Sequence, residues 1–230
     1  MKITQIETFQ ADAGLRMFSF LKVTTDDGII GWSEFNESFG SVGLSDVIRG
    51  LSPVLIGRDP RQFEQITQHL HVLTRQSRGG LNQQAIAAIE NAMLDVAGKA
   101  YGIPVAALFG GPIRDRIPVY WSHFGTYRVR SAALMGVPEL RNYDDLAKHA
   151  QEVKQRGFRA LKTNSLPLNE GTLSSYVPGF GRTPGWPALN WDEGMLQAAR
   201  DTLAALRAGA GNAVGLMLDI NFHFKTDGFL

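Results

Sequence analysis

Two short apolar segments that each end abruptly in polar residues constrain the fold of this chain most. Residues 215–221 read GLMLDIN, an apolar run that stops at Asp219. Residues 158–164 show the same pattern and reach Lys162. Continuous apolar runs of this length are typical of strands buried on both faces of a parallel sheet. Because such folds carry their chemistry at the carboxyl ends of the strands, we expect a cation and an anion at the same rim.

The composition is that of an ordinary folded protein, with 44% hydrophobic residues among 230 and a formal net charge of +1. This charge gives no general attraction to nucleic acid or to an anionic membrane. The chain has no cysteine, so oxygen and imidazole are the expected metal ligands, and Mg²⁺ is the default cation. No segment approaches the roughly 20 apolar residues of a membrane span, and the N-terminus is unlike a signal peptide. We therefore expect a cytoplasmic protein.

The beginning of the chain predicts an antiparallel sheet of three strands, over residues 2–10, 18–25 and 29–35. The last two are joined by an Asp-Gly turn. The loop over residues 11–17 carries Arg16, and the loop after the third strand is rich in asparagine, glycine and serine. Each loop is interpreted either as a mobile lid or as a plain surface loop.

Three helices are predicted after this sheet, over residues 45–55, 60–75 and 82–101. Ser45 is expected to cap the first helix, and Pro60 to begin the second. The third has apolar residues at helical spacing along a stripe rich in small side chains, so it should pack closely against a neighbour. Strands followed by helices indicate an α+β domain.

Strands alternate with helices in the second half of the chain, which predicts a parallel sheet with right-handed crossovers. The long connection over residues 166–190 is interpreted as a functional cover or an interface arm. The chain then divides into an α+β domain, residues 1–112, and an α/β domain, residues 113–230. The elements expected in the second domain cover residues 117–122, 143–156, 158–161, 191–207 and 215–221.

The polar residues at the two strand ends are the first candidates for a functional site. Strand periodicity places Lys162 with Asn164 on one face, and Asp219 with Asn221 on one face. Asp219 is expected to bind a divalent metal, and Lys162 to polarise a carboxylate or to move a proton with a lowered pKa. The alternative is a structural lysine–aspartate pair that closes the end of the sheet.

Histidines and arginines near these strands are weaker candidates. His123 follows the first expected strand of the second domain, and His223 lies two residues past Asn221. Either could serve as an acid or base, but a lone histidine is more often a surface or core residue. Arg128 and Arg130 could bind a carboxylate, but surface arginines are common and we assign them no role.

Four segments, which together span nearly the whole chain, carry a resemblance to a known family. They are FLKVTTDDGIIGWSE (residues 20–34), AIAAIENAMLDVAGKAYGIPVAALFGG (85–111), LKTN (161–164) and LDIN (218–221). The helix with its terminal glycines, followed by a barrel strand, is the most specific of these features. The chain resembles the enolase superfamily, in its mandelate racemase and muconate lactonizing branch.

The resemblance implies an α+β capping domain whose loops, including the one with Arg16, close over a modified TIM barrel. This chain would hold the first three strands of that barrel. The resemblance also implies that Mg²⁺ assists removal of the proton α to a carboxylate, through an enediolate. Asp219 matches the first of the family's three metal-binding carboxylates, and Lys162 the first position of its Lys-x-Lys motif.

Asn164 departs from that motif, because an amide cannot replace the second lysine as a base. The departure is similar to that of acid-sugar dehydratases in the same branch, which implies a hydro-lyase of carbohydrate acid catabolism with His223 as a candidate acid. Four residues are expected to contact the substrate: Asn164, Asn221, Arg16 and His123. The alternatives are a racemase or epimerase of a hydroxy acid or amino-acid derivative with Lys162 as base, and a non-catalytic, truncated family member.

The 230 residues are expected to be the N-terminal part of a longer enzyme, or to work only with a second chain that completes the barrel, and to be inactive alone. The reason is that the family's other metal carboxylates and its base would lie further on. The expected partner is a small carboxylate, a sugar acid, and neither nucleic acid nor a membrane is expected. A homo-oligomer is expected because this architecture often assembles through its capping domains and long loops.

Overall fold

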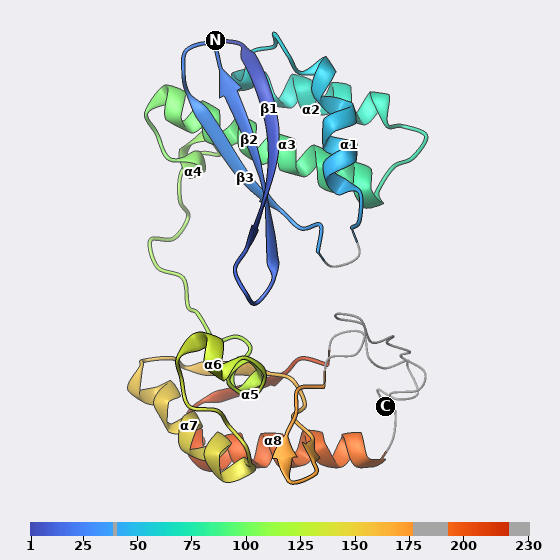
Figure 1. Cartoon of the computed structure of the whole chain (residues 1–230). Coiled ribbons are helices and arrows are strands. Elements are labelled where there is room, and N and C mark those ends of the chain that lie inside the picture. The colour runs from blue at the N-terminus through green and yellow to red at the C-terminus, as the bar shows by residue number, and fades with distance from the viewer. Residues whose placement is uncertain (39–40, 177–192, 221–230) are drawn as a thin grey trace. The chain divides into compact units, whose positions relative to one another are not determined.

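A computed structural model of the chain describes residues 1–38, 41–176 and 193–220. The chain divides into two compact units, Met1–Asp115 and Arg116–Leu230, which are shown in Figure 1. Among the described helices, none combines the length and the hydrophobicity that crossing a membrane requires.

The N-terminal unit contains an antiparallel sheet in the order β1-β2-β3. Its strands are β1 Ile3–Asp12, β2 Met17–Thr25 and β3 Ile30–Phe35. Pairing of Asp12 with Met17 shortens the first loop to residues 13–16, whereas the sequence predicts a loop over residues 11–17. Burial alternates along β2, so one face of the sheet packs against the core. The predicted three-stranded meander is confirmed.

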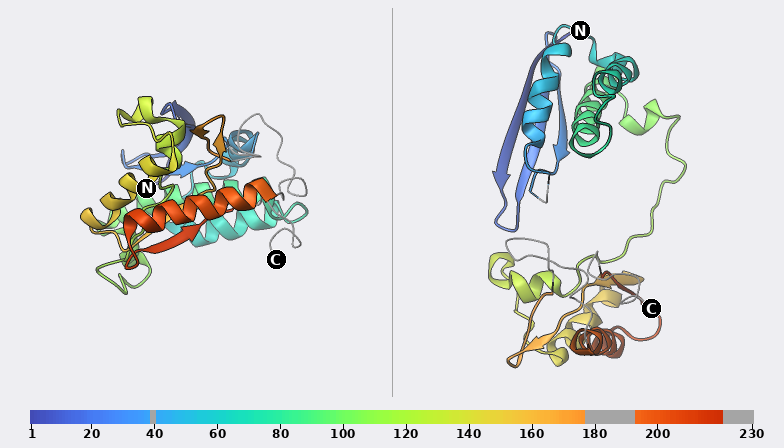
Figure 2. Two further views of the ribbon diagram at one scale, coloured as in Figure 1. Left: turned by 90° about the horizontal axis from the view of Figure 1, so that it is seen from below. Right: turned by 90° about the vertical axis from the view of Figure 1, so that its right-hand side faces the viewer.

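Helices cover one face of this sheet, as the right-hand view of Figure 2 shows. The longest, α3 (Gly80–Tyr101), approaches it so closely that a β-carbon at Gly31 would lie 2.2 Å from the carbonyl oxygen of Ala92. Ser33 Oγ also donates a hydrogen bond of 2.7 Å to the carbonyl of Ala88. The predicted close packing of this helix is confirmed. The other helices of the unit are α1 Leu44–Leu51, α2 Phe63–Leu73 and α4 Val105–Leu108, with 3₁₀ turns at Ser52–Val54 and Pro60–Gln62.

The start of α1 differs from the prediction that Ser45 caps it. Gly43 precedes the helix with φ of 87°, and no side chain at that position caps it. Instead, the Glu37 carboxylate accepts hydrogen bonds from the N–H of Gly43 at 3.0 Å and from Ser45 Oγ at 2.7 Å. Burial raises the pKa of Glu37, but these hydrogen bonds outweigh it and lower the pKa. The first turn is therefore satisfied by a carboxylate in the preceding loop.

The C-terminal unit contains a parallel pair of strands covered on one face by two helices. Leu161 and Leu206 belong to the cluster that joins the strands to these helices. A β-carbon at Gly209 would lie 1.9 Å from the carbonyl oxygen of Ala147, so the two helices are in close contact. The elements are α5 Thr126–Arg130, α6 Ala132–Met135, α7 Tyr143–Gln155, β4 Ala160–Thr163, β5 Leu168–Asn169, β6 Thr172–Leu173, α8 Glu193–Ala210 and β7 Gly215–Leu218. β4 pairs in parallel with β7, and β5 pairs with β6.

Two predictions for this unit are wrong. Residues 117–122 do not form a regular strand, because Trp121 alone bridges to Leu161, and the neighbouring Tyr120 is 44% exposed. β4 and β7 are not buried on both faces, since Met217 is 37% exposed. Within the described residues, helices cover only one side of the pair. The predicted class, an α+β domain followed by strands of a partial barrel, is nevertheless confirmed.

Candidate active site

Lys162 and Asp219 form an ion pair at the carboxyl ends of β4 and β7. Lys162 lies opposite Met217 in the parallel register, and Asp219 follows two residues later, so strand alternation directs both side chains away from the helix-covered face. Lys162 Nζ lies 3.0 Å from Asp219 Oδ2, and the two side chains are 25% and 29% exposed. The N–H of Asp219 donates to the carbonyl of Thr163 at 2.8 Å. A cation and an anion therefore meet at one rim of the sheet.

The electrostatics of this pair favour the charged form of the lysine. The hydrogen bond to Asp219 is the largest effect, and it raises the pKa of Lys162 against a smaller, opposing effect of burial. Tyr120 raises this pKa further, and its ring centroid lies 5.5 Å from Lys162 Nζ. The direction is opposite to the lowered pKa expected from the sequence. The reason is that the carboxylate stabilises the ammonium more than partial burial destabilises it.

Asn164 is buried just beyond the end of β4, with 3% of its surface exposed. Its Nδ2 donates a hydrogen bond of 2.8 Å to the backbone carbonyl of Asp219. Its Oδ1 accepts one of 3.2 Å from Thr126 Oγ1. Strand periodicity places Asn164 beside Lys162, but β4 ends at Thr163 and the periodicity ends with it. Both polar groups of the amide are engaged by the protein itself.

The structure describes only one of the two candidate histidines, His123. His123 is exposed, has a positive φ of 50°, and its ring centroid lies 5.1 Å from that of Tyr127. His223 lies outside the described residues, as does Asn221. The roles expected for these three residues stay predictions.

Arg16 belongs to the N-terminal unit and is engaged there by its neighbours. Its guanidinium pairs with Glu34 at 3.0 Å and lies 4.1 Å above the ring centroid of Phe18. The contact with substrate that the sequence predicts for Arg16 stays a prediction.

Sequence patterns do not predict a buried cluster on the helix-covered side of β4. His149 of α7 is 4% exposed and stacks on Phe124, with ring centroids 4.2 Å apart. Burial and then Arg128 lower the pKa of His149, although Glu152, 3.2 Å from Nδ1, opposes them. Arg128 contacts Glu152 with two nitrogens, at 3.2 and 3.3 Å. The pair is 24 residues apart, and no local motif could indicate it.

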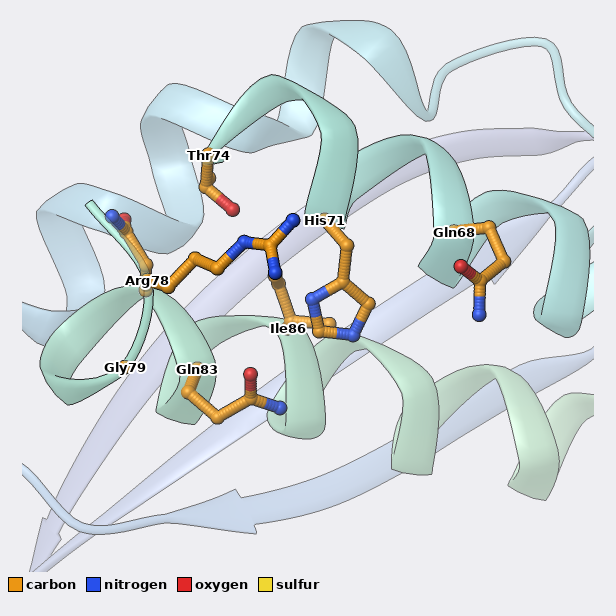
Figure 3. A pocket seen from close by; sticks show the side chains of 8 residues that line it. Gln68, His71, Thr74, Arg78, Gly79, Gln83 and Ile86 are labelled. Atoms are coloured by element: carbon orange, nitrogen blue, oxygen red, sulfur yellow. The ribbon is translucent and has the colours of Figure 1, made fainter. Parts of the chain in front are cut away.

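The N-terminal unit also has a polar pocket of about 320 Å³ between α2 and the start of α3. Figure 3 shows the guanidinium of Arg78 pointing toward His71, with Gln83 and Ile86 contributed by α3. Arg78 is exposed, and an exposed arginine is a common surface feature. We assign no site to this pocket.

The residues at the strand ends fit Mg²⁺ in part. Asp219 offers carboxylate oxygen, the ligand type that Mg²⁺ prefers, and this ion commonly uses one or two carboxylates together with water and substrate oxygens. In the part of the chain that the structure describes, no group of three or more histidine, aspartate or glutamate side chains is gathered for a metal. Asp219 is therefore suited to be one of several ligands of a Mg²⁺ ion.

Comparisons of sequence place the chain among enzymes of one branch. Residues 6–110 match the family model for the mandelate racemase / muconate lactonizing enzyme, N-terminal domain. A D-galactonate dehydratase family member from Streptomyces bingchenggensis is 32% identical over 214 residues, which are 93% of this chain and 50% of that protein. A D-galactonate dehydratase from Pectobacterium atrosepticum is 38% identical over 120 residues, 52% of this chain and 31% of that protein. The chain thus spans half or less of the length of these relatives.

Comparisons of structure agree. A protein from Burkholderia xenovorans strain LB400, provisionally described as an L-alanine-DL-glutamate epimerase, matches with a TM-score of 0.92 and 42% identity, over 100% of this chain and 58% of that one. Its structure bound to magnesium and fumarate matches with a TM-score of 0.91 over 99% of this chain and 56% of that one. A provisionally described dehydratase from Mesorhizobium loti has a TM-score of 0.73 and 26% identity, over 95% of this chain and 53% of that one.

The fold defines a class of protein in which an α+β domain precedes the parallel strands of a barrel. Together with these matches, it supports a relationship of the chain to the enolase superfamily, in the mandelate racemase and muconate lactonizing enzyme branch.

Proposed function

We propose that the whole protein is a Mg²⁺-dependent hydro-lyase that removes water from a sugar acid. The observation that carries the proposal is the Lys162–Asp219 pair, with 3.0 Å between Nζ and Oδ2, at the strand ends where barrel enzymes place their chemistry. The substrate class is supported by relatives named D-galactonate dehydratase. The metal is supported by the magnesium bound in a structure 42% identical to this chain.

Each of the two residues has a defined task in this proposal. Asp219 binds Mg²⁺, which would supply positive charge beside the substrate's carboxylate. Lys162 presents its ammonium on the same face and donates a hydrogen bond to that carboxylate. In the reaction, the C–H bond α to the carboxylate and the C–O bond of the β-hydroxyl break, and water leaves. We assign neither proton transfer to a described residue, and His223 remains the candidate acid.

The test is an Asp219→Asn variant of the full-length protein, assayed with D-galactonate and other sugar acids for formation of the 2-keto acid. Loss of the carboxylate should lower Mg²⁺-dependent turnover by roughly 10²–10³-fold or more, the scale seen for one electrostatic contact to a transition state. Asp201→Asn is the matched control, because Asp201 lies on α8 and its carboxylate accepts from Gln197. Near-normal turnover in Asp219→Asn, or turnover that does not need Mg²⁺, would refute the assignment.

Epimerisation of a hydroxy acid or an amino-acid derivative is the second candidate. It is favoured by the 42% identity to the protein provisionally described as an epimerase. In that reaction the α-proton leaves and returns on the other side of the carbon, no C–O bond breaks, and Lys162 would act as base. Incubation in deuterium oxide separates the two: deuterium at the α-carbon without loss of water indicates epimerisation, and a 2-keto product indicates dehydration.

We also propose that the whole protein is a cytoplasmic homo-oligomer with a small carboxylate as its substrate. The uncovered face of the N-terminal sheet supports an oligomer, because Phe9 and Trp32 are 41% and 44% exposed there and large exposed apolar patches commonly mark interfaces. We propose further that residues 1–230 alone do not turn over substrate, since the described residues gather no complete metal site.

A further inference from the structure

The side chain of Asn164 connects three elements at the end of the sheet. It follows β4, donates through Nδ2 to the carbonyl of Asp219 beyond β7 at 2.8 Å, and accepts through Oδ1 from Thr126, the first residue of α5, at 3.2 Å. Asn164 is 3% exposed and Thr126 is 2% exposed. Water has little access to these hydrogen bonds, which makes them strong and makes loss of a partner costly.

These contacts fix the backbone of Asp219 on both of its sides. Its N–H donates to the carbonyl of Thr163 at 2.8 Å, and its carbonyl accepts from the side chain of Asn164. Thr163 and Asn164 are consecutive, so one short stretch of chain holds both polar groups of the Asp219 backbone. Asp219 lies beyond the last residue of β7, Leu218, and it is nevertheless held in register with β4.

We propose that Asn164 is a positioning residue that holds the backbone of Asp219 and thereby aims its carboxylate at the rim. The inference rests on the proposed role of Asp219 as a metal ligand, and it replaces the substrate contact that the sequence suggests for Asn164. An amide suits this task because it donates to a carbonyl and accepts from a hydroxyl at the same time. A carboxylate lacks the donor, and a lysine lacks the acceptor. With 3% of its surface exposed, Asn164 offers a substrate little access to its amide.

The experiment compares Asn164→Asp with wild type in the full-length protein. Hydrogen exchange of the Asp219 backbone amide, measured without metal, should become at least about tenfold faster, because the backbone carbonyl of Asp219 loses the hydrogen bond donated by Asn164. The dissociation constant for Mg²⁺, measured by calorimetry without substrate, should rise by roughly 10–100-fold, the usual effect of removing support from a metal ligand. Asn169→Asp is the matched control, because the Asn169 amide donates to Ser174 Oγ on the exposed β5-β6 hairpin, and it should change neither quantity.

A second variant keeps the test decisive if Asn164→Asp does not fold. Thr126→Val removes only the partner of Asn164 Oδ1, so it should shift the same two quantities in the same direction by a smaller factor. Unchanged exchange at Asp219 in these variants, or a raised KM for substrate with unchanged exchange, overturns the inference. Unchanged Mg²⁺ affinity in Asp219→Asn instead overturns the metal assignment in the proposed function, while faster exchange in Asn164→Asp would still support the positioning role.

Discussion

The two units of the chain use strand alternation for different purposes. In the N-terminal unit, the inward side chains Leu21 and Val23 of β2 are fully buried, and α3 packs against the neighbouring strand. In the C-terminal unit, β4 buries Leu161 against helices and presents Lys162 on its other face, where Lys162 pairs with Asp219 at the end of β7. The comparison teaches that the covered faces stabilise the fold, whereas the uncovered face carries the candidate chemistry.

The largest loss of stability is expected where one methyl group is added between closely packed backbones. In Gly31→Ala the new β-carbon would lie 2.2 Å from the carbonyl oxygen of Ala92, so β3 and α3 must separate. The free energy of unfolding, measured by urea denaturation, should fall by about 2–3 kcal/mol. Gly209→Ala should produce a similar loss in the other unit, because its β-carbon would lie 1.9 Å from a backbone oxygen.

Gly50→Ala is the control for these variants, because nothing lies within 4 Å of a β-carbon at that position in α1. It should leave stability unchanged or raise it by up to about 1 kcal/mol through helix propensity. If Gly31→Ala behaved like Gly50→Ala, the close approach of sheet and helix would not be what stabilises the N-terminal unit.

The second-largest effect is expected in the C-terminal unit, where the stability of the fold should depend on pH through His149. Burial lowers the pKa of His149 below its ordinary value of 6.5, so the unfolded chain binds the proton more readily than the folded one. The stability contributed by neutral His149 is then fully present above about pH 6.5 and is lost as pH falls through the folded-state pKa. His149→Leu should flatten this dependence in urea denaturation between about pH 5 and 7.5. If His149→Leu kept the wild-type slope of unfolding free energy against pH, groups other than His149 would cause the dependence.

The smallest effect on stability is expected at the candidate site itself. The pairs Lys162–Asp219 and Lys22–Glu7 both span 3.0 Å, and their side chains are 24–30% exposed. Lys162→Met and Lys22→Met should therefore each change the free energy of unfolding by less than about 1 kcal/mol. Only Lys162→Met should also lower turnover of the full-length enzyme, by roughly 10²–10³-fold. Equal loss of activity in both variants would remove the functional distinction between the two ion pairs.

Local patterns in the sequence predict those elements whose stability comes from consecutive residues. The helix expected over residues 143–156 is α7, Tyr143–Gln155, and the strand expected directly after it is β4, Ala160–Thr163. Residues 117–122 have strand-forming side chains but gain only one bridge, at Trp121. A strand is stabilised by the partners beside it, and the composition of the segment carries no information about those partners.

The candidate site was predictable to the same degree. Parallel strands end at a common edge, which allowed Lys162 and Asp219 to be placed together from the sequence. Asn164 accepts a hydrogen bond from Thr126, 38 residues away, and the capping of α1 by Glu37 depends on a loop that folds back. Such contacts follow from three-dimensional packing, and a local capping or periodicity rule does not include them.

The pairing of β3 with α3 also has a consequence for synthesis on the ribosome. The hydrogen bond from Ser33 can form only after Ala88, 55 residues later in the chain, has been synthesised. The meander is complete at Phe35, whereas α3 ends at Tyr101. At roughly 5–20 residues per second, translation separates these two points by about 3–13 seconds. During that interval the apolar face of the sheet lacks the helix that covers it. We expect this face to be the part of the nascent chain that a chaperone binds.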